Sequence, residues 1–105
     1  MHINEFAKII YDRDLKHEKK KVFDWEYYAI AMAGESGEVL DTLKKIKRGD
    51  PGLSKKDVAE EVADVIGFAF LLLKELDVDP EKTLLDKFEK VNRRLDAGGY
   101  HARPD

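Results

Sequence analysis

The chain has 105 residues, of which 43% are apolar and 39% are charged, and these values are typical of a single globular domain. Its 19 basic and 22 acidic residues nearly balance, so it lacks the positive field that holds the phosphates of DNA or RNA. It has no cysteine, which excludes disulfides and thiolate chemistry, and no run of about 18 uncharged apolar residues that would cross a membrane. We therefore expect one cytoplasmic domain over residues 1–105 that binds neither a nucleic-acid polymer nor a membrane.

The first predicted element is a short amphipathic helix over residues 3–15. Apolar side chains recur at positions 3, 6, 9 and 10, which is the spacing of one helical face, and Asn4 is available as its cap. A run that contains four lysines, at 16–21, ends this helix. We interpret the run as a solvated connector rather than as a binding patch.

Three longer helices are predicted to follow, each with a capping residue at its start. They are expected over residues 24–48, 54–76 and 79–97. Their caps are Asp24, the capping-box pair of Ser54 and Asp57, and Asp79 followed by Pro80. The Gly-Asp-Pro-Gly sequence at 49–52 and the glycine pair at 98–99 stop the second and the fourth helix. No segment alternates with period two over more than a few residues, so the sequence predicts an all-α bundle of about four helices.

The third of these helices is apolar on all sides over part of its length. Between Val62 and Leu73, only Asp64 and Gly67 are not apolar. A helix of this kind must be covered on several sides, and four helices of which one is short cannot easily do so. We therefore expect a second copy of the chain to complete the core, in a homodimer or a homotetramer.

Four carboxylates occupy matching positions on the second and third helices. At about 100° per residue, Glu35 and Glu38 lie to one side of the apolar stripe of their helix, and Glu61 and Asp64 lie to the same side of theirs. Both helices share the pattern A-x-E-x-x-[ED]-V-[LI]. If the two helices pack antiparallel, the two pairs converge on one point.

Carboxylates gathered at one point repel one another unless a cation lies among them. The donors are all oxygen atoms, because the three histidines lie outside the predicted core helices. Such donors favour a hard divalent ion, with Mg²⁺ first, Mn²⁺ next and Ca²⁺ third. The alternative is that these are ordinary solvated charges, since an E-x-x-[ED] pair arises easily among 22 acidic residues. Two pairs in matching phase favour the metal site.

The fourth helix adds a row of cations. Lys87, Lys90 and Arg94 lie beside its apolar stripe, and Asn92 lies on the opposite flank. Such a row beside a metal site suits a polyphosphate. Its alternative role is to complement the helix dipole near the C-terminus and to keep the surface wet.

The sequence resembles the MazG-like nucleotide pyrophosphohydrolases, an all-α group of nucleoside triphosphate pyrophosphatases, and in particular their short phage-type and bacterial members. The mark of the family is E-x-x-E followed on the next helix by E-x-x-D, present here as Glu35-Ser-Gly-Glu38 and Glu61-Val-Ala-Asp64. The likeness covers about residues 24–95. It includes WEYYAIAMAGESGEVLDTLKKIKR at 25–48, AEEVADVIGF at 59–68 and the closing KFEKVNRR at 87–94.

The resemblance implies an oligomeric, Mg²⁺-dependent enzyme, with Mn²⁺ as a substitute, that cleaves a (d)NTP into (d)NMP and pyrophosphate and serves nucleotide-pool house-cleaning. It implies that the metal ligands are Glu35, Glu38, Glu61 and Asp64. In the mechanism that follows from it, Glu38 is our choice for the base that takes a proton from the attacking water.

The resemblance also suggests residues that would bind the substrate. Lys87, Asn92 and either Arg93 or Arg94 match the closing motif and would hold phosphate or sugar. Aromatic side chains are candidates for stacking on the base, with core packing as the alternative for each; they are Trp25, Tyr28 and Phe68.

Two positions depart from the family pattern. Many members have Glu where this chain has Gly34, and Tyr where it has Phe68. The missing Glu removes a candidate base or second-metal ligand. It keeps open an alternative function, that of a non-catalytic helical oligomer that binds a nucleotide or a protein through the same groove.

Overall fold

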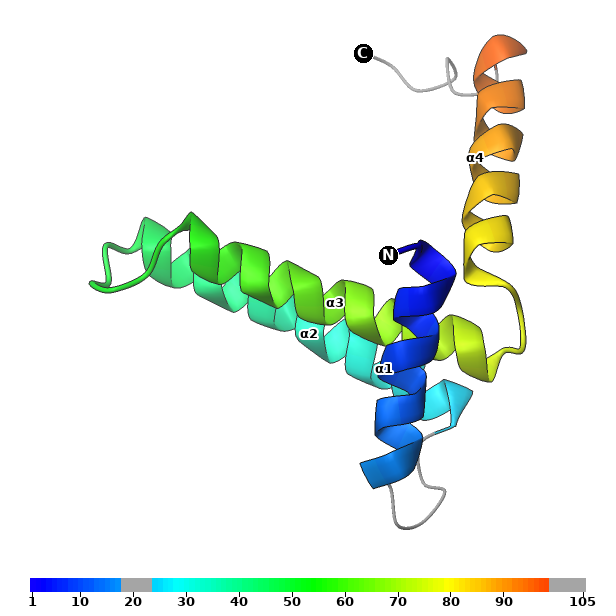
Figure 1. The fold of residues 1–105 in the computed structure, drawn as a ribbon. Helices are drawn as coiled ribbons and strands as arrows, with labels where there is room; N and C mark the ends of the chain where they lie inside the picture. Colours follow the sequence, from blue (N-terminus) through cyan, green and yellow to red (C-terminus); the bar gives the residue numbers. More distant parts are fainter. Residues whose placement is uncertain (18–23, 99–105) are drawn as a thin grey trace.

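The computed structural model describes residues 1–17 and 24–98, and its regular elements in these ranges are four α-helices (Figure 1). They are α1 (Ile3–His17), α2 (Trp25–Lys47), α3 (Lys55–Glu75) and α4 (Pro80–Asp96). The described residues contain no strand. The predicted all-α class and the order of helices are confirmed. Of the predicted connector, the part from residue 18 onward lies outside the described residues, as does the tail from residue 99.

The helix starts follow from the capping residues. The carboxylate of Asp24 accepts a hydrogen bond from the backbone amide of the third residue of α2, and that of Asp79 does the same for α4, both at 2.8 Å. At the start of α3, Ser54 and Asp57 form the reciprocal capping box, in which the Asp57 carboxylate accepts from the Ser54 amide at 2.8 Å. These bonds satisfy amides that have no partner within the helix.

Helices α2 and α3 form a long antiparallel hairpin, and their contact is the most extensive in the chain (Figure 1). The short connection between them turns at Gly49 and Gly52, whose φ angles of 88° and 82° are easily adopted only by glycine. The guanidinium of Arg48 donates to both carboxylate oxygens of Asp50 and closes the turn. This connection keeps the same faces of the two helices together along their whole length.

Helix α1 crosses the end of the hairpin that holds the start of α2 and the end of α3 (Figure 1). The buried apolar side chains of the described residues lie mainly at this crossing. Ile10 of α1, Tyr28 of α2 and Leu71 of α3 form one cluster, and Phe68 packs against it. The core therefore sits at one end of the hairpin, and no other described helix covers the rest of it.

Helix α4 leaves the end of α3 at a steep angle and contacts only α1 and α3 among the helices (Figure 1). Asn4, expected as the cap of α1, lies instead within its first turn and holds the start of α4. Its amide nitrogen donates to both oxygens of Asp79 at 3.0 Å, and its amide oxygen accepts from the backbone of Glu81 at 2.9 Å.

The chain is more extended than its length requires. Its radius of gyration is 17.2 Å, whereas a compact domain of this size has about 13 Å. Large apolar side chains remain exposed on all four helices, among them Ile9, Ile30, Leu40, Ile66, Leu84, Leu85 and Phe88. None of the helices in the described part of the chain is both long and apolar enough to span a membrane.

Candidate functional site

Three of the four predicted metal ligands meet between α2 and α3. Glu35 comes from the middle of α2, and Glu61 and Asp64 lie one turn apart on α3. Each of the three offers a carboxylate oxygen, and these oxygens all lie within 4.8 Å of one another. The antiparallel hairpin produces this convergence because it places the two similar segments side by side. We call Glu35, Glu61 and Asp64 the carboxylate cluster.

Electrostatic repulsion within the cluster is felt most clearly at Glu61. Its pKa is raised above its ordinary value, first by partial burial and then by the negative charges of Asp64, Glu38 and Glu35. Burial and the neighbouring negative charges both destabilise the charged form of Glu61. A cation among these oxygens would stabilise that form. The donor set, three carboxylates with no histidine or cysteine, fits a hard divalent ion.

Glu38 lies one turn after Glu35 but is not among the three residues whose oxygens converge. Its side chain is exposed, and its charge still contributes to the raised pKa of Glu61. Glu38 is therefore close to the carboxylate cluster, but its carboxylate does not converge with the other three.

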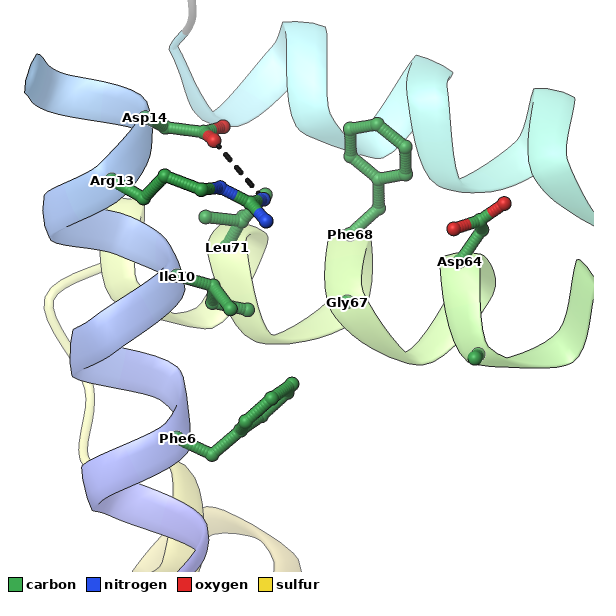
Figure 2. Close-up of a pocket in the computed structure, with 9 residues that line it drawn as sticks. Phe6, Ile10, Arg13, Asp14, Asp64, Gly67, Phe68 and Leu71 are labelled. Atoms are coloured by element: carbon green, nitrogen blue, oxygen red, sulfur yellow. Dashed lines mark hydrogen bonds and ion pairs between the residues drawn. The ribbon is translucent and has the colours of Figure 1, made fainter. Parts of the chain in front are cut away.

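Two open hollows flank the carboxylate cluster, and Phe68 lines both. The first, of about 440 Å³, lies along α2 and is lined by Tyr27, Ile30, Ala31, Gly34, Glu35, Glu38 and Phe68. The second, of about 280 Å³, lies between α1 and α3 and has Asp64 at one end (Figure 2). Phe68 also packs on Tyr28, with ring centroids 6.3 Å apart. One aromatic ring thus borders both spaces next to the cluster.

Gly34 lines the first hollow and has no side chain to fill it. No atom lies within 4 Å of the position that a Cβ would take there, so the backbone has room for a side chain. The departure from the family pattern at this position therefore enlarges the space beside Glu35 and Glu38 rather than relieving a clash.

The other predicted substrate residues are not brought to the cluster within one chain. Lys87, Asn92 and Arg94 lie on α4, which makes no contact with α2. Trp25 begins α2, ten residues before Glu35 and hence about 15 Å along the helix. It is about half exposed and lines neither hollow. Their roles in binding substrate stay predictions.

Sequence reasoning missed the contribution of α1. Arg13 and Asp14 line the second hollow together with Phe6 and Ile10 of the same helix. The spacing 6, 10, 13 and 14 is that of one helical face, which was a usable signal. It was not sufficient, because nothing in the sequence indicates that this face of α1 crosses α3 beside Asp64.

Comparison with known proteins gives one distant relative. The Gene 37 protein of Mycobacterium phage L5 is 29% identical to this chain over 76 residues, which covers 69% of this chain and 67% of that protein. No protein-family model matches the sequence, and no solved structure matches it. The name of the phage protein states no activity, so the functional conclusions depend on the carboxylate cluster and its surroundings.

Proposed function

We propose that this protein is a MazG-like nucleoside triphosphate pyrophosphohydrolase, which cleaves a (d)NTP to (d)NMP and pyrophosphate with Mg²⁺. The observation that carries the proposal is the convergence of Glu35, Glu61 and Asp64 from two helices that share one sequence pattern. An E-x-x-[ED] pair arises easily by chance. The convergence of Glu35 from one pair with both members of the other pair across a helix hairpin is a more demanding coincidence.

The carboxylate cluster would hold the ion, with Glu38 available from the next turn of α2. Mg²⁺ fits the all-oxygen donors best, and Mn²⁺ is the natural substitute. When bound, the ion supplies neutralisation of the phosphate charge. The chain itself supplies the positions of the donors, which are fixed by the hairpin, and an open approach through the hollow beside Gly34.

Glu38 is the residue proposed to accept the proton. Its carboxylate is exposed on the lining of the first hollow and lies outside the group of three converging oxygens. A carboxylate oxygen in this position can orient a water molecule and take its proton as the water attacks the α-phosphorus. No covalent intermediate with the protein is needed, since water is the nucleophile.

We further propose that the protein acts as a homodimer or homotetramer. Phe88 on α4 is 63% exposed and Ile66 on α3 is 47% exposed, although both belong to apolar stripes. A second copy would cover these faces. It would also give a role to Lys87, Asn92 and Arg94, because α4 stands apart from the carboxylate cluster of its own chain. In this proposal they bind phosphate or sugar at the cluster of a partner copy.

The decisive experiment is a product assay over canonical and modified dNTPs and NTPs with Mg²⁺. We expect pyrophosphate release from at least one nucleotide, lowered about 100-fold or more in Glu38→Gln, which removes a general base. Asp64→Asn is expected to require more Mg²⁺ for half-maximal rate. Glu26→Gln, which neutralises an exposed carboxylate in the first turn of α2, serves as the matched control and should retain the wild-type rate.

A negative product assay would overturn the catalytic proposal. If no nucleotide in the panel is hydrolysed at high enzyme concentration, the catalytic proposal is wrong. Tight binding of Mg²⁺ and nucleotide by calorimetry without product would then favour the non-catalytic nucleotide-binding oligomer. An absence of any thermal shift with Mg²⁺ or Mn²⁺ would exclude the metal site as well.

A further inference from the structure

The hollow between α1 and α3 has the chemistry of a small ligand pocket. Its volume of about 280 Å³ is slightly below that of ordinary ligand pockets, which hold about 300–1,000 Å³. That size suits one ring system better than a whole nucleotide. Asp64, a member of the carboxylate cluster, lines one end of the pocket, so its occupant would lie directly beside the metal centre.

The walls of this pocket are apolar and aromatic. Phe6 projects from α1 and Phe68 from α3, with Ile10 one turn after Phe6 and Leu71 one turn after Phe68 (Figure 2). Gly67 leaves the wall open, because no atom lies within 4 Å of the position of a Cβ there. Flat aromatic side chains around a narrow space favour a planar ligand.

Two hydrogen bonds in sequence connect the buried Tyr28 to Arg13, the cation that lines this pocket. The buried Tyr28 donates a hydrogen bond from its hydroxyl to Asp14 at 3.1 Å. The other carboxylate oxygen of Asp14 accepts from the guanidinium of Arg13 at 3.3 Å. Figure 2 shows Arg13 reaching from α1 toward α3, with Phe68 between it and Asp64. The contact with Asp14 uses only part of a group that has five N–H donors.

The charges in the pocket do not suit a phosphate. Arg13 is the one cation among the lining residues, and the carboxylate of Asp14 beside it offsets its charge. No net positive charge is left at this end of the pocket to hold a phosphate. The remaining donors of Arg13 instead suit neutral acceptor atoms, and both oxygens of Asp14 are already engaged.

We infer that the pocket between α1 and α3 binds the base of the nucleotide, and that Arg13 selects bases that present adjacent acceptor atoms. This inference rests on the proposed function. Guanine offers O6 and N7 side by side to a guanidinium, whereas adenine places an amino donor next to N7. Tyr28, which does not line the pocket, and Asp14, whose carboxylate oxygens are engaged by Tyr28 and Arg13, act as positioning residues for Arg13.

The test compares wild type with Arg13→Ala and Arg13→Lys, using dGTP and dATP. The wild-type enzyme should prefer dGTP. Arg13→Ala should raise KM for dGTP about tenfold or more, with kcat and the KM for dATP little changed, because a bidentate contact to a base has been lost. Arg13→Lys should recover part of the preference. Lys16→Ala, which removes an exposed cation on the same helix outside the pocket, is the control and should keep the preference.

A second variant tests the location of the base independently of Arg13. Gly67→Leu would fill the pocket without meeting neighbouring atoms at its Cβ, and it should raise KM for all nucleotides. Ala59→Leu, on the exposed part of the same helix, controls for the added volume and should leave KM unchanged. For the positioning residues, Tyr28→Phe should reduce the preference for dGTP over dATP by a smaller factor than Arg13→Ala.

Failure of the inference and failure of the proposed function give different results. If wild type hydrolyses nucleotides and Arg13→Ala has the same KM values, the base contact is refuted. If Arg13→Ala weakens the binding of all nucleotides equally, and that of inorganic pyrophosphate as well, Arg13 binds phosphate and the inference is wrong. If no nucleotide is hydrolysed, binding of non-hydrolysable triphosphates measured by calorimetry replaces KM. Equal affinities of wild type and Arg13→Ala, or no binding to either, would then overturn the inference.

Discussion

At the residue scale, Glu61 is the member of the carboxylate cluster whose pKa is clearly shifted. Its pKa is raised from 4.5 by partial burial first, and then by Asp64, Glu38 and Glu35. A carboxyl whose pKa is higher in the folded state contributes stability that is complete below its unfolded pKa and is lost as pH rises through its folded pKa. We therefore expect the metal-free protein to lose stability from this group as pH rises above about 4.5.

Thermal melts at a series of pH values, without divalent ions, would measure this loss in wild type and in Glu61→Gln. Glu61→Gln should lack this pH-dependent loss of stability, and it should have a higher melting temperature than wild type at neutral pH. Mg²⁺ should raise the melting temperature of wild type at neutral pH and much less near pH 4.5, because protons compete with the ion for the same oxygens. Glu60→Gln, which neutralises a neighbour that affects Glu61 least, should behave like wild type. A wild-type profile in Glu61→Gln would contradict the expectation.

At the element scale, one side chain of α1 is hydrogen-bonded to the start of α4. Asn4 binds both the capping carboxylate of α4 and the backbone amide of Glu81. Asn4→Ala removes a side-chain cap from that amide and should lower the free energy of unfolding by about 1 kcal/mol. Urea denaturation would measure this loss. Hydrogen exchange should show faster exchange in α4, while α2 and α3 keep their protection.

A double-mutant cycle with Asp79→Ala separates the two roles of Asn4. If the contact between the two side chains matters, the effects of the single substitutions should not add. Additive effects together with unchanged exchange in α4 would show that α4 is held by its apolar contacts instead. The lowered pKa of Asp79, caused first by the Lys82 amide and then by Asn4, should rise in Asn4→Ala.

The helices were predictable from the sequence because their signals are local. The Asp24 cap, the capping box of Ser54 and Asp57, and the glycines at 49 and 52 act within a few residues of the boundaries that they set. The meeting of Glu35 with Glu61 was predictable for a related reason: a short turn forces the two similar segments to lie antiparallel. The role of Asn4 was mistaken because the partner that it binds is 75 residues away.

The pocket beside Asp64 was not predictable, since it depends on where α1 crosses α3. The apolar face of α1 indicates that the helix packs on something, but not on which segment or at which angle. The same limit applies to α4. Its stripe of Leu84, Phe88, Val91 and Leu95 predicted a buried face. Within one chain Val91 is only partly buried and the other three side chains are exposed.

At the scale of the whole molecule, the uncovered faces and the separation of α4 from the carboxylate cluster have one common explanation, the proposed second copy. The cluster is acidic, while the second half of α4 carries Lys87, Lys90, Arg93 and Arg94. These opposite charges would favour an arrangement in which α4 of one copy approaches the cluster of another. Sedimentation should show a dimer or tetramer at micromolar concentration, and Phe88→Glu should shift it toward monomer without loss of helical content.

Mixing two inactive variants tests whether such an assembly shares its sites. Glu38→Gln removes the proposed base beside the carboxylate cluster, and Lys87→Ala combined with Arg94→Ala removes the proposed phosphate-binding cations of α4. If α4 serves the cluster of the partner copy, a mixed dimer contains one doubly damaged site and one intact site. Exchange of subunits in an equal mixture should then restore about a quarter of the wild-type pyrophosphate release, because half of the dimers are mixed and each has one of two sites. If α4 served its own chain, every site would carry one defect. A mixture that stays inactive although sedimentation or fluorescence shows that the subunits have exchanged would therefore refute sharing of the site between copies.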